Sequence, residues 1–231
     1  PYGRVFSTIF QGLFPPEHPY GHPTIGSMED LNAATLEDVK SWFENYYGPN
    51  NAVLVLAGDI DRATAETLTK TYFGDIPPGP PLSVWKAWVP DRSEPRLQVM
   101  ADRVPQTRIY RTWVAPEDTS PEATDLSIAA SILGDGKNSR LYKELVYDKQ
   151  LATNVSVFNF ELSLASLFGI VVSVQPGVDV GDVETALDRQ IEAFLDRAPS
   201  RSEVELVSTK TRARVIRGLE KVGGFGAARD P

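Results

Sequence analysis

In the first part of the chain, apolar positions recur at helical spacing just before a proline-rich stretch. Between positions 5 and 14 they lie four residues apart, which predicts one face of an amphipathic helix. Residues 15–26 contain too many prolines for a helix or a central strand, so we expect a structured loop there. The helical stripe consists of Val5, Phe6, Ile9, Phe10, Leu13 and Phe14.

Two helix-capping signals follow the loop. Ser27 precedes Asp30, and Thr35 precedes Asp38, at the spacing that separates an N-cap residue from the third helical residue. The apolar positions after Thr35 then repeat on one face, with polar residues between them. Together these signals predict a helix over residues 36–47.

A continuous apolar run and a run of prolines come next. Residues 52–58, Ala-Val-Leu-Val-Leu-Ala-Gly, have the length of a strand and predict one that is buried on both faces or nearly so. Asp59 and Asp61 are expected to cap a helix over residues 62–73. The prolines of residues 77–81 favour polyproline II, so we place a linker and a module boundary within residues 77–95.

After the linker, pairs of strands alternate with groups of helices. Strands grouped in this way argue for an α+β fold of antiparallel sheets backed by helices, and against a doubly wound α/β sheet. The strands are predicted at residues 96–104, 108–115, 154–162 and 167–175. The helices are predicted at 121–133, with Pro121 in the first turn, and at 139–147, 181–197 and 200–219, before a glycine-rich segment at 223–226.

Composition narrows the chemistry of the protein. The chain has 231 residues, of which 42% are hydrophobic and 23% charged, so it can bury a core and is not disordered. Its net charge of −8 argues against nucleic acid or an anionic membrane surface as the main partner. It contains no cysteine, which excludes disulfides, thiol nucleophiles and Cys-ligated metals. No apolar run approaches the length of a membrane span.

The two histidines, His18 and His22, are four residues apart and could share a zinc ion if they lay on one helix face. Pro19 and Gly21 between them prevent a regular helix, and no glutamate lies between them to act as a general base. We therefore expect a loop whose histidines form local hydrogen bonds. With no other histidine available, a Ser–His–Asp site has no positive support.

The segment Gly-Asp-Gly-Lys-Asn-Ser-Arg at residues 134–140 has two interpretations. It follows a helix and lacks the spacing of a phosphate-binding P-loop, so nucleotide binding is not expected. It could be a flexible turn between helices, or a glycine loop that faces a substrate. The pairs Asp59/Asp61 and Glu203/Glu205 are explained by helix capping. Trp85 and Trp88 are expected to anchor the linker over a groove between modules, with a peptide-binding aromatic shelf as the alternative.

Several strings together resemble the M16 metallopeptidases, the relatives of pitrilysin and insulinase. Residues 13–27 and 46–59 look like part of the first module of that family. Residues 132–142 and 149–156 are similar to the start of its second homologous module. These matching strings are Leu-Phe-Pro-Pro-Glu-His-Pro-Tyr-Gly-His-Pro-Thr-Ile-Gly-Ser, Tyr-Tyr-Gly-Pro-Asn-Asn-Ala-Val-Leu-Val-Leu-Ala-Gly-Asp, Ile-Leu-Gly-Asp-Gly-Lys-Asn-Ser-Arg-Leu-Tyr and Lys-Gln-Leu-Ala-Thr-Asn-Val-Ser.

The resemblance implies two related M16-type modules of the LuxS/metallohydrolase-like fold, which enclose an extended peptide. Each module would be incomplete in this chain. Residues 1–76 would be the C-terminal part of the first module, 77–95 a proline-rich linker and 96–231 the N-terminal part of the second. The family holds zinc with an inverted His-x-x-Glu-His helix and a more distant Glu. This sequence has no such motif, and the family's order places both elements before Pro1, so we expect a fragment of a longer protein.

The resemblance also implies a function. The parent protein would be a zinc metalloendopeptidase acting on peptides or unfolded polypeptides, with a metal-activated water and a Glu base. This fragment would hold no zinc, have no catalytic residue and be inactive alone. In relatives the second-module glycine loop lies near the substrate channel, which assigns substrate binding to Gly134, Gly136, Asn138, Ser139 and Arg140.

Two positions depart from the family pattern: Asp135 stands where relatives often have glycine, and Thr153 replaces a frequent aromatic residue. Asp135 could contact a basic peptide or cap the following helix. The alternatives to a peptidase are a non-catalytic M16-like partner subunit and a standalone peptide-binding module. The expected assembly is a homodimer or an active/inactive M16 heterodimer. The type of relative suggests a bacterial periplasmic or cell-envelope location.

Overall fold

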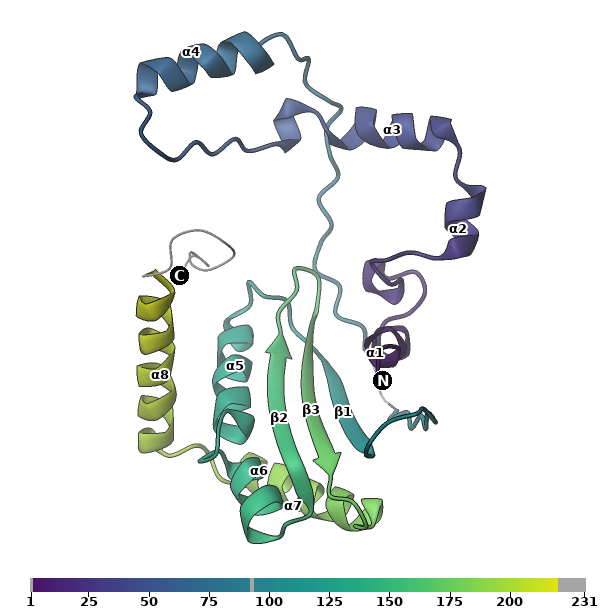
Figure 1. Ribbon diagram of the computed structural model, residues 1–231, viewed down its shortest axis with the longest axis vertical. Coiled ribbons are helices and arrows are strands. Elements are labelled where there is room, and N and C mark those ends of the chain that lie inside the picture. The colour runs from purple at the N-terminus through teal and green to yellow at the C-terminus, as the bar shows by residue number, and fades with distance from the viewer. Residues whose placement is uncertain (1, 92–93, 220–231) are drawn as a thin grey trace. The chain divides into compact units, whose positions relative to one another are not determined.

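The computed structural model describes residues 2–91 and 94–219 (Figure 1). The chain divides into two structural units: Pro1–His22 together with Ala87–Pro231, and Pro23–Lys86. The glycine-rich segment predicted at residues 223–226 lies outside the described residues, as do residues 92–93 of the predicted linker. Each unit is described by itself below.

The first unit contains a three-stranded antiparallel sheet in the order β1-β3-β2 (Figure 1). The strands are β1 (Arg108–Ala115), β2 (Ala152–Phe160) and β3 (Ser166–Val174). In the register of β1 and β3, Ala115 pairs with Ser166 and Arg108 with Ser173. The register of β2 against β3 shifts between Ala152 and Asn154. The predicted strands at residues 108–115, 154–162 and 167–175 are confirmed, with small shifts at the ends.

Helices pack against this sheet, mainly on the edge strand β2, and form the core with it. They are α5 (Pro121–Gly134), the short α6 (Arg140–Tyr142), the π-helical turn η3 (Lys143–Asp148), α7 (Val180–Asp196) and α8 (Arg201–Leu219). The prediction of helices over these stretches is confirmed, as is the α+β class. The difference is that residues 139–147 are not one α-helix, since η3 is wound as a π-helix. The core comprises Ile109, Leu133, Leu141, Leu145, Ala152, Val155, Ile170, Val172, Val174, Val183, Ala186 and Leu187.

The N-terminal segment belongs to the same unit. Helix α1 (Val5–Leu13) contacts β1, and the turn η1 (Pro19–Gly21) follows it in the proline-rich loop. Phe14 and His18, on this loop, are fully or almost fully buried. The predicted helix and structured loop are both confirmed.

The second unit contains α2 (Met28–Ala33), α3 (Leu36–Tyr46), the turn η2 (Pro49–Asn51) and α4 (Arg62–Phe73). The capping predictions are confirmed: Ser27 accepts a hydrogen bond from the Asp30 N–H, and Thr35 and Asp38 form a complete capping box. Asp61 caps α4 by accepting from the Thr64 N–H at 2.9 Å. None of residues 23–86 is buried in the structure.

Two predicted strands are wrong. Residues 52–58 and 96–104 form no strand in the part of the chain that the structure describes. The side chains of Val53 and Val99 are 90% and 88% exposed, whereas the apolar run had predicted burial on both faces. The physical reason is that a strand exists only where neighbouring strands accept and donate its backbone hydrogen bonds. No described segment pairs with either run.

Among the described helices, none combines the length and the apolar character that crossing a membrane requires.

Candidate functional site

The glycine loop, residues 135–139, connects the end of α5 to the start of α6. The Asp135 N–H donates to the Ser131 carbonyl and ends α5. Gly136 has φ +84°, a backbone conformation that glycine adopts without strain. The Ser139 N–H and Oγ both donate to the Gly136 carbonyl, at 3.1 and 2.7 Å. The loop is therefore a closed turn held by hydrogen bonds within it.

Gly134, the last residue of α5, is buried against β2. A Cβ atom at this position would collide with the Val157 side chain and with its backbone nitrogen. Glycine is therefore required here for the close approach of α5 to the sheet. Gly134 therefore brings the end of α5, where the loop begins, close to β2.

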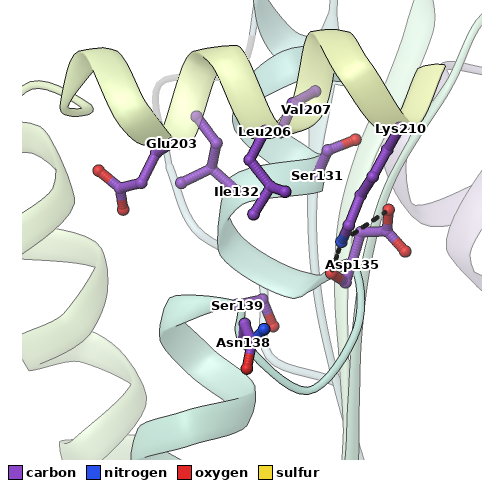
Figure 2. A pocket seen from close by; sticks show the side chains of 9 residues that line it. All are labelled: Ser131, Ile132, Asp135, Asn138, Ser139, Glu203, Leu206, Val207 and Lys210. Atoms are coloured by element: carbon purple, nitrogen blue, oxygen red, sulfur yellow. Dashed lines mark hydrogen bonds and ion pairs between the residues drawn. The ribbon is translucent and has the colours of Figure 1, made fainter. Parts of the chain in front are cut away.

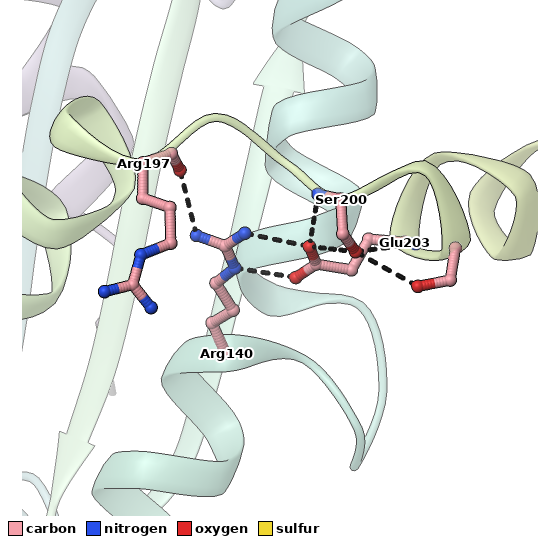
Figure 3. A network of polar contacts seen from close by, with 5 residues as sticks. Arg140, Arg197, Ser200 and Glu203 are labelled. Atoms are coloured by element: carbon pink, nitrogen blue, oxygen red, sulfur yellow. Dashed lines mark hydrogen bonds and ion pairs between the residues drawn. The ribbon is translucent and has the colours of Figure 1, made fainter.

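Arg140 lies directly after the loop and is surrounded by groups of this chain (Figure 3). Its Nε and Nη2 donate to the two carboxylate oxygens of Glu203, at 2.7 and 2.8 Å. Its Nη1 lies 3.5 Å from the Arg197 carbonyl, and its guanidinium lies 5.1 Å from the centre of the Phe194 ring. Such a bidentate pair is both strong and specific in geometry. It links the start of α6 to the start of α8.

The pair with Arg140 changes the titration of Glu203. The hydrogen bonds from Arg140 lower the pKa of Glu203 to about 2, against the opposing effect of burial, and Ser200 contributes in the same direction. The same pair raises the pKa of Arg140. Glu203 is therefore ionised throughout the neutral range.

Asp135 contacts a second part of α8. Its carboxylate lies 3.9 Å from the Lys210 Nζ and 3.5 Å from the Arg214 Nη2, and Lys210 also donates to the Asp135 carbonyl at 3.2 Å. Its side chain is not the cap of α6, since the residue at that position is Ser139. The second interpretation from the sequence, that Asp135 caps the following helix, is wrong. These contacts are long and partly exposed, so they are weaker than the Arg140–Glu203 pair.

A shallow hollow lies between the glycine loop and α8 (Figure 2). Apolar side chains of α5 and α8 form part of its lining, and polar groups of the loop form the rest. Asn138 lies on the loop side of the hollow, and its side chain is exposed. The lining residues are Ser131, Ile132, Asp135, Asn138, Ser139, Glu203, Leu206, Val207 and Lys210.

The structure thus separates the five predicted substrate-binding residues into two groups. Gly136 and Asn138 are exposed on the loop. Gly134, Ser139 and Arg140 are engaged with β2, with the loop itself and with Glu203.

Sequence reasoning missed Glu203, Lys210 and Arg214 as partners of the loop. Residues 203, 206, 207, 210 and 214 recur at helical spacing, which could have indicated one face of α8. Nothing local in the sequence indicated that this face meets a loop more than sixty residues away.

The histidines do not form a metal site. The Nδ1 atom of His18 accepts from the Tyr20 N–H at 3.0 Å, and its Nε2 atom donates to the Trp88 carbonyl at 2.9 Å. The predicted local hydrogen bonding is confirmed for His18, whose two ring nitrogens are both occupied. Within residues 2–91 and 94–219, no cluster of three or more His, Cys, Asp or Glu side chains could hold a metal ion. The residues described here therefore do not fit a zinc site.

Trp88 and Glu205 also have structural explanations. Trp88 packs on the His18 ring, with ring centres 4.8 Å apart. Trp85 is exposed. Glu205 pairs with Arg201 one turn away on the surface of α8, at 2.7 Å.

Comparison with known proteins places these features in context. The family model described as the peptidase M16 inactive domain matches residues 33–210. Zinc protease PqqE of Helicobacter pylori is 28% identical over 229 residues, which is 95% of this chain and 49% of that protein. Mitochondrial-processing peptidase subunit beta of Blastocladiella emersonii is 24% identical over 94% of this chain and 47% of that protein.

A solved structure of a protease from Helicobacter pylori superposes with a TM-score of 0.75 at 25% sequence identity. The match covers 96% of this chain and 54% of that one. The chain spans about half the length of the curated relatives it matches.

Proposed function

The chain belongs to the peptidase M16 inactive domain family, and from this premise we propose that it forms the peptide-binding part of a zinc-dependent metalloendopeptidase. The observation that carries the proposal is the similarity to a protein named zinc protease, which extends over 95% of this chain. In the proposal the substrate is a peptide or an unfolded polypeptide, enclosed between two M16-type modules. The zinc ion and the residues that activate water are supplied by parts of the protein other than the described residues.

In this proposal the glycine loop lines the path of the peptide. The closed turn and the exposed positions of Gly136 and Asn138 support it, because an ordered loop loses little conformational entropy on binding. Asn138 offers an amide that can donate to and accept from a peptide backbone. Gly136 has no side chain and lets the peptide approach the loop closely.

The proposal includes an assembly of two subunits. One relative is named as a subunit of a processing peptidase. A homodimer, or a heterodimer of an active and an inactive subunit, follows from the proposal. Light scattering on the full-length protein, alone and with candidate partner chains, distinguishes a dimer from a monomer.

Cleavage of an unfolded substrate by the full-length protein tests the proposal. We expect the full-length protein to cleave fluorescein-labelled casein, to lose this activity with a zinc chelator and to regain it when zinc is added. The 231-residue chain by itself is expected to show none. An Asn138→Ala variant should raise KM, whereas Asn32→Ala, an exposed asparagine on α2, should leave KM unchanged.

Two outcomes contradict the proposal. Chelator-sensitive cleavage by the 231-residue chain alone would mean that the chain holds its own metal. Absence of cleavage by the zinc-loaded full-length protein, alone and with its partner, would indicate a non-catalytic M16-like subunit or a peptide-binding module.

A further inference from the structure

We propose that Arg140 is a positioning residue: its pair with Glu203 sets the conformation of the glycine loop for peptide binding, and Arg140 itself does not touch the peptide. This inference rests on the proposed function and assigns a mechanism to one residue of the same site. It replaces the direct contact between Arg140 and substrate that the sequence resemblance implied.

The guanidinium of Arg140 is already occupied. Two of its nitrogens donate to the two oxygens of Glu203, at 2.7 and 2.8 Å, and its face lies over the Phe194 ring. The Arg140 side chain is only 22% exposed. A peptide carboxylate could form a bidentate pair with Nε and Nη2 of Arg140 only by displacing Glu203, at the cost of a partly buried charge pair.

Glu203 is held in place independently of Arg140. The Ser200 N–H and Oγ donate to the Glu203 Oε2 at 2.7 and 2.8 Å, and the Glu203 N–H donates back to the Ser200 Oγ at 3.3 Å (Figure 3). This reciprocal arrangement is a capping box at the start of α8. The acceptor is therefore oriented by α8, and the bidentate geometry transmits that orientation to Arg140.

Both ends of the glycine loop are attached to the same helix. Arg140, after the loop, contacts Glu203, and Asp135, at its start, contacts Lys210. Glu203 and Lys210 are two helical turns apart and so lie on one face of α8. The pair at Glu203 is tight, and the contact at Lys210 is long, at 3.9 Å between the charged atoms. The tight pair therefore holds the loop more firmly against α8 than the long contact does.

The residues between Asp135 and Arg140 remain available for contact with the peptide. Lys137 and Asn138 are exposed, and their side chains form no hydrogen bond within the part of the chain that the structure describes. Loss of the Arg140–Glu203 pair should therefore loosen the loop and weaken peptide binding, while the groups that perform the chemical step remain unchanged.

The experiment compares variants of the full-length protein. Glu203→Gln and Arg140→Lys remove the bidentate pair; Arg140→Lys keeps the positive charge but loses the planar fork. Glu205→Gln is the matched control, because Glu205 forms an ion pair of the same 2.7 Å length with Arg201 on the surface of α8. Hydrogen exchange of residues 135–139, affinity for fluorescein-labelled casein with zinc chelated, and KM and kcat are measured for each.

We expect Glu203→Gln to raise the hydrogen-exchange rate of residues 135–139 by about tenfold and to raise KM by about tenfold. Each change corresponds to the loss of one strong pair. The value of kcat should stay within about twofold of wild type. Arg140→Lys should have a smaller effect in the same direction. Combining Arg140→Ala with Glu203→Gln should weaken casein binding no further than Arg140→Ala alone, because both changes remove one pair.

Three results overturn the inference. One is a hydrogen-exchange rate of residues 135–139 in Glu203→Gln that equals the rate in the Glu205→Gln control. Another is faster exchange with unchanged affinity and KM. The third is an Arg140→Ala effect on affinity that persists in full in the Glu203→Gln background, because Arg140 would then touch the peptide itself. If the wild-type protein neither binds nor cleaves casein, the proposed function fails, and hydrogen exchange still decides whether Arg140 sets the loop.

Discussion

The Nε2 atom of His18 donates a hydrogen bond to the carbonyl of Trp88 at 2.9 Å, across 70 residues of sequence. The imidazole also packs between aromatic rings, with centres 4.6 Å from Phe14 and 4.8 Å from Trp88. His18 is completely buried. This residue therefore joins the N-terminal segment to the linker segment around Trp88, and its role is structural.

Replacement of His18 by Phe should destabilise the protein and leave its metal content unchanged. The ring volume is kept, but the Trp88 carbonyl loses its donor, which costs about 1–3 kcal/mol in the free energy of unfolding. Urea unfolding and zinc content of the full-length protein measure the two effects. His22→Ala, at an exposed position of the same loop, should be nearly neutral. Loss of zinc from His18→Phe at unchanged stability would contradict the structural role.

The stability contributed by the Arg140–Glu203 pair should depend on pH in the acid range. The pKa of Glu203 is lowered from its ordinary value near 4.5 to about 2 by Arg140. A carboxyl whose pKa is lowered in the folded state stabilises the protein when the pH is above the pKa of the unfolded state. This contribution is lost as the pH falls from about 4.5 towards 2. Glu203→Gln should therefore be less stable than wild type at pH 7, by about 1 kcal/mol.

Urea unfolding at pH 7, 5 and 3 measures this dependence for both proteins. The difference in the free energy of unfolding should be constant between pH 7 and 5 and smaller at pH 3. A difference that is unchanged at pH 3 would mean that Glu203 does not titrate as a paired carboxylate.

Gly134→Ala should destabilise the first unit. The added methyl group would collide with Val157, and relief of that collision requires α5 to move away from β2, at a cost of about 1–3 kcal/mol. Gly218→Ala is the control, because a Cβ there, in the last turn of α8, has no neighbour within 4 Å. That change should be neutral or slightly stabilising, because the full gain of alanine over glycine applies to a helix interior.

Combining Gly134→Ala with Val157→Ala should restore only part of the loss, because the backbone nitrogen of Val157 is also in the way. Thermal unfolding of the three variants measures these effects. A stability of Gly134→Ala equal to that of wild type would show that α5 does not pack this closely on the sheet.

Asn50 should hold the start of the proline-rich linker within the second unit. Its Oδ1 accepts from the Gly79 N–H at 2.7 Å, and its Nδ2 donates to the Gly79 carbonyl at 3.2 Å. Asn50→Ala removes both hydrogen bonds and should increase hydrogen exchange at Gly79 and cleavage near it by a nonspecific protease. Asn50→Asp keeps the acceptor and should retain part of the protection. Equal protection in Asn50→Ala and wild type would contradict this role.

Local features of the fold were predictable from the sequence because their donors and acceptors are only a few residues apart. The cap at Ser27, the capping box at Thr35, the cap at Asp61 and the first-turn position of Pro121 depend on backbone groups within three residues. The helices and the three strands of the sheet followed from the same short-range patterns. The glycine loop was also recognised as a candidate site.

Features that depend on distant partners were decided only by the tertiary structure. The apolar run at residues 52–58 has the composition of a buried strand, but the described residues provide no neighbour for its backbone hydrogen bonds. Gly134 looked like part of a substrate loop, and its close contact with Val157 assigns it to packing.

The sequence by itself determined most of the helices, the three strands of the sheet, the α+β class and the family, because each follows from short-range periodicity or from recognisable strings. The tertiary structure decided which residues of the glycine loop remain exposed. Arg140 and Glu203 are 63 residues apart and meet only after α8 packs near the loop. That meeting engages the Nε and Nη2 atoms of an arginine expected to bind substrate, and in our proposal Arg140 holds the loop instead.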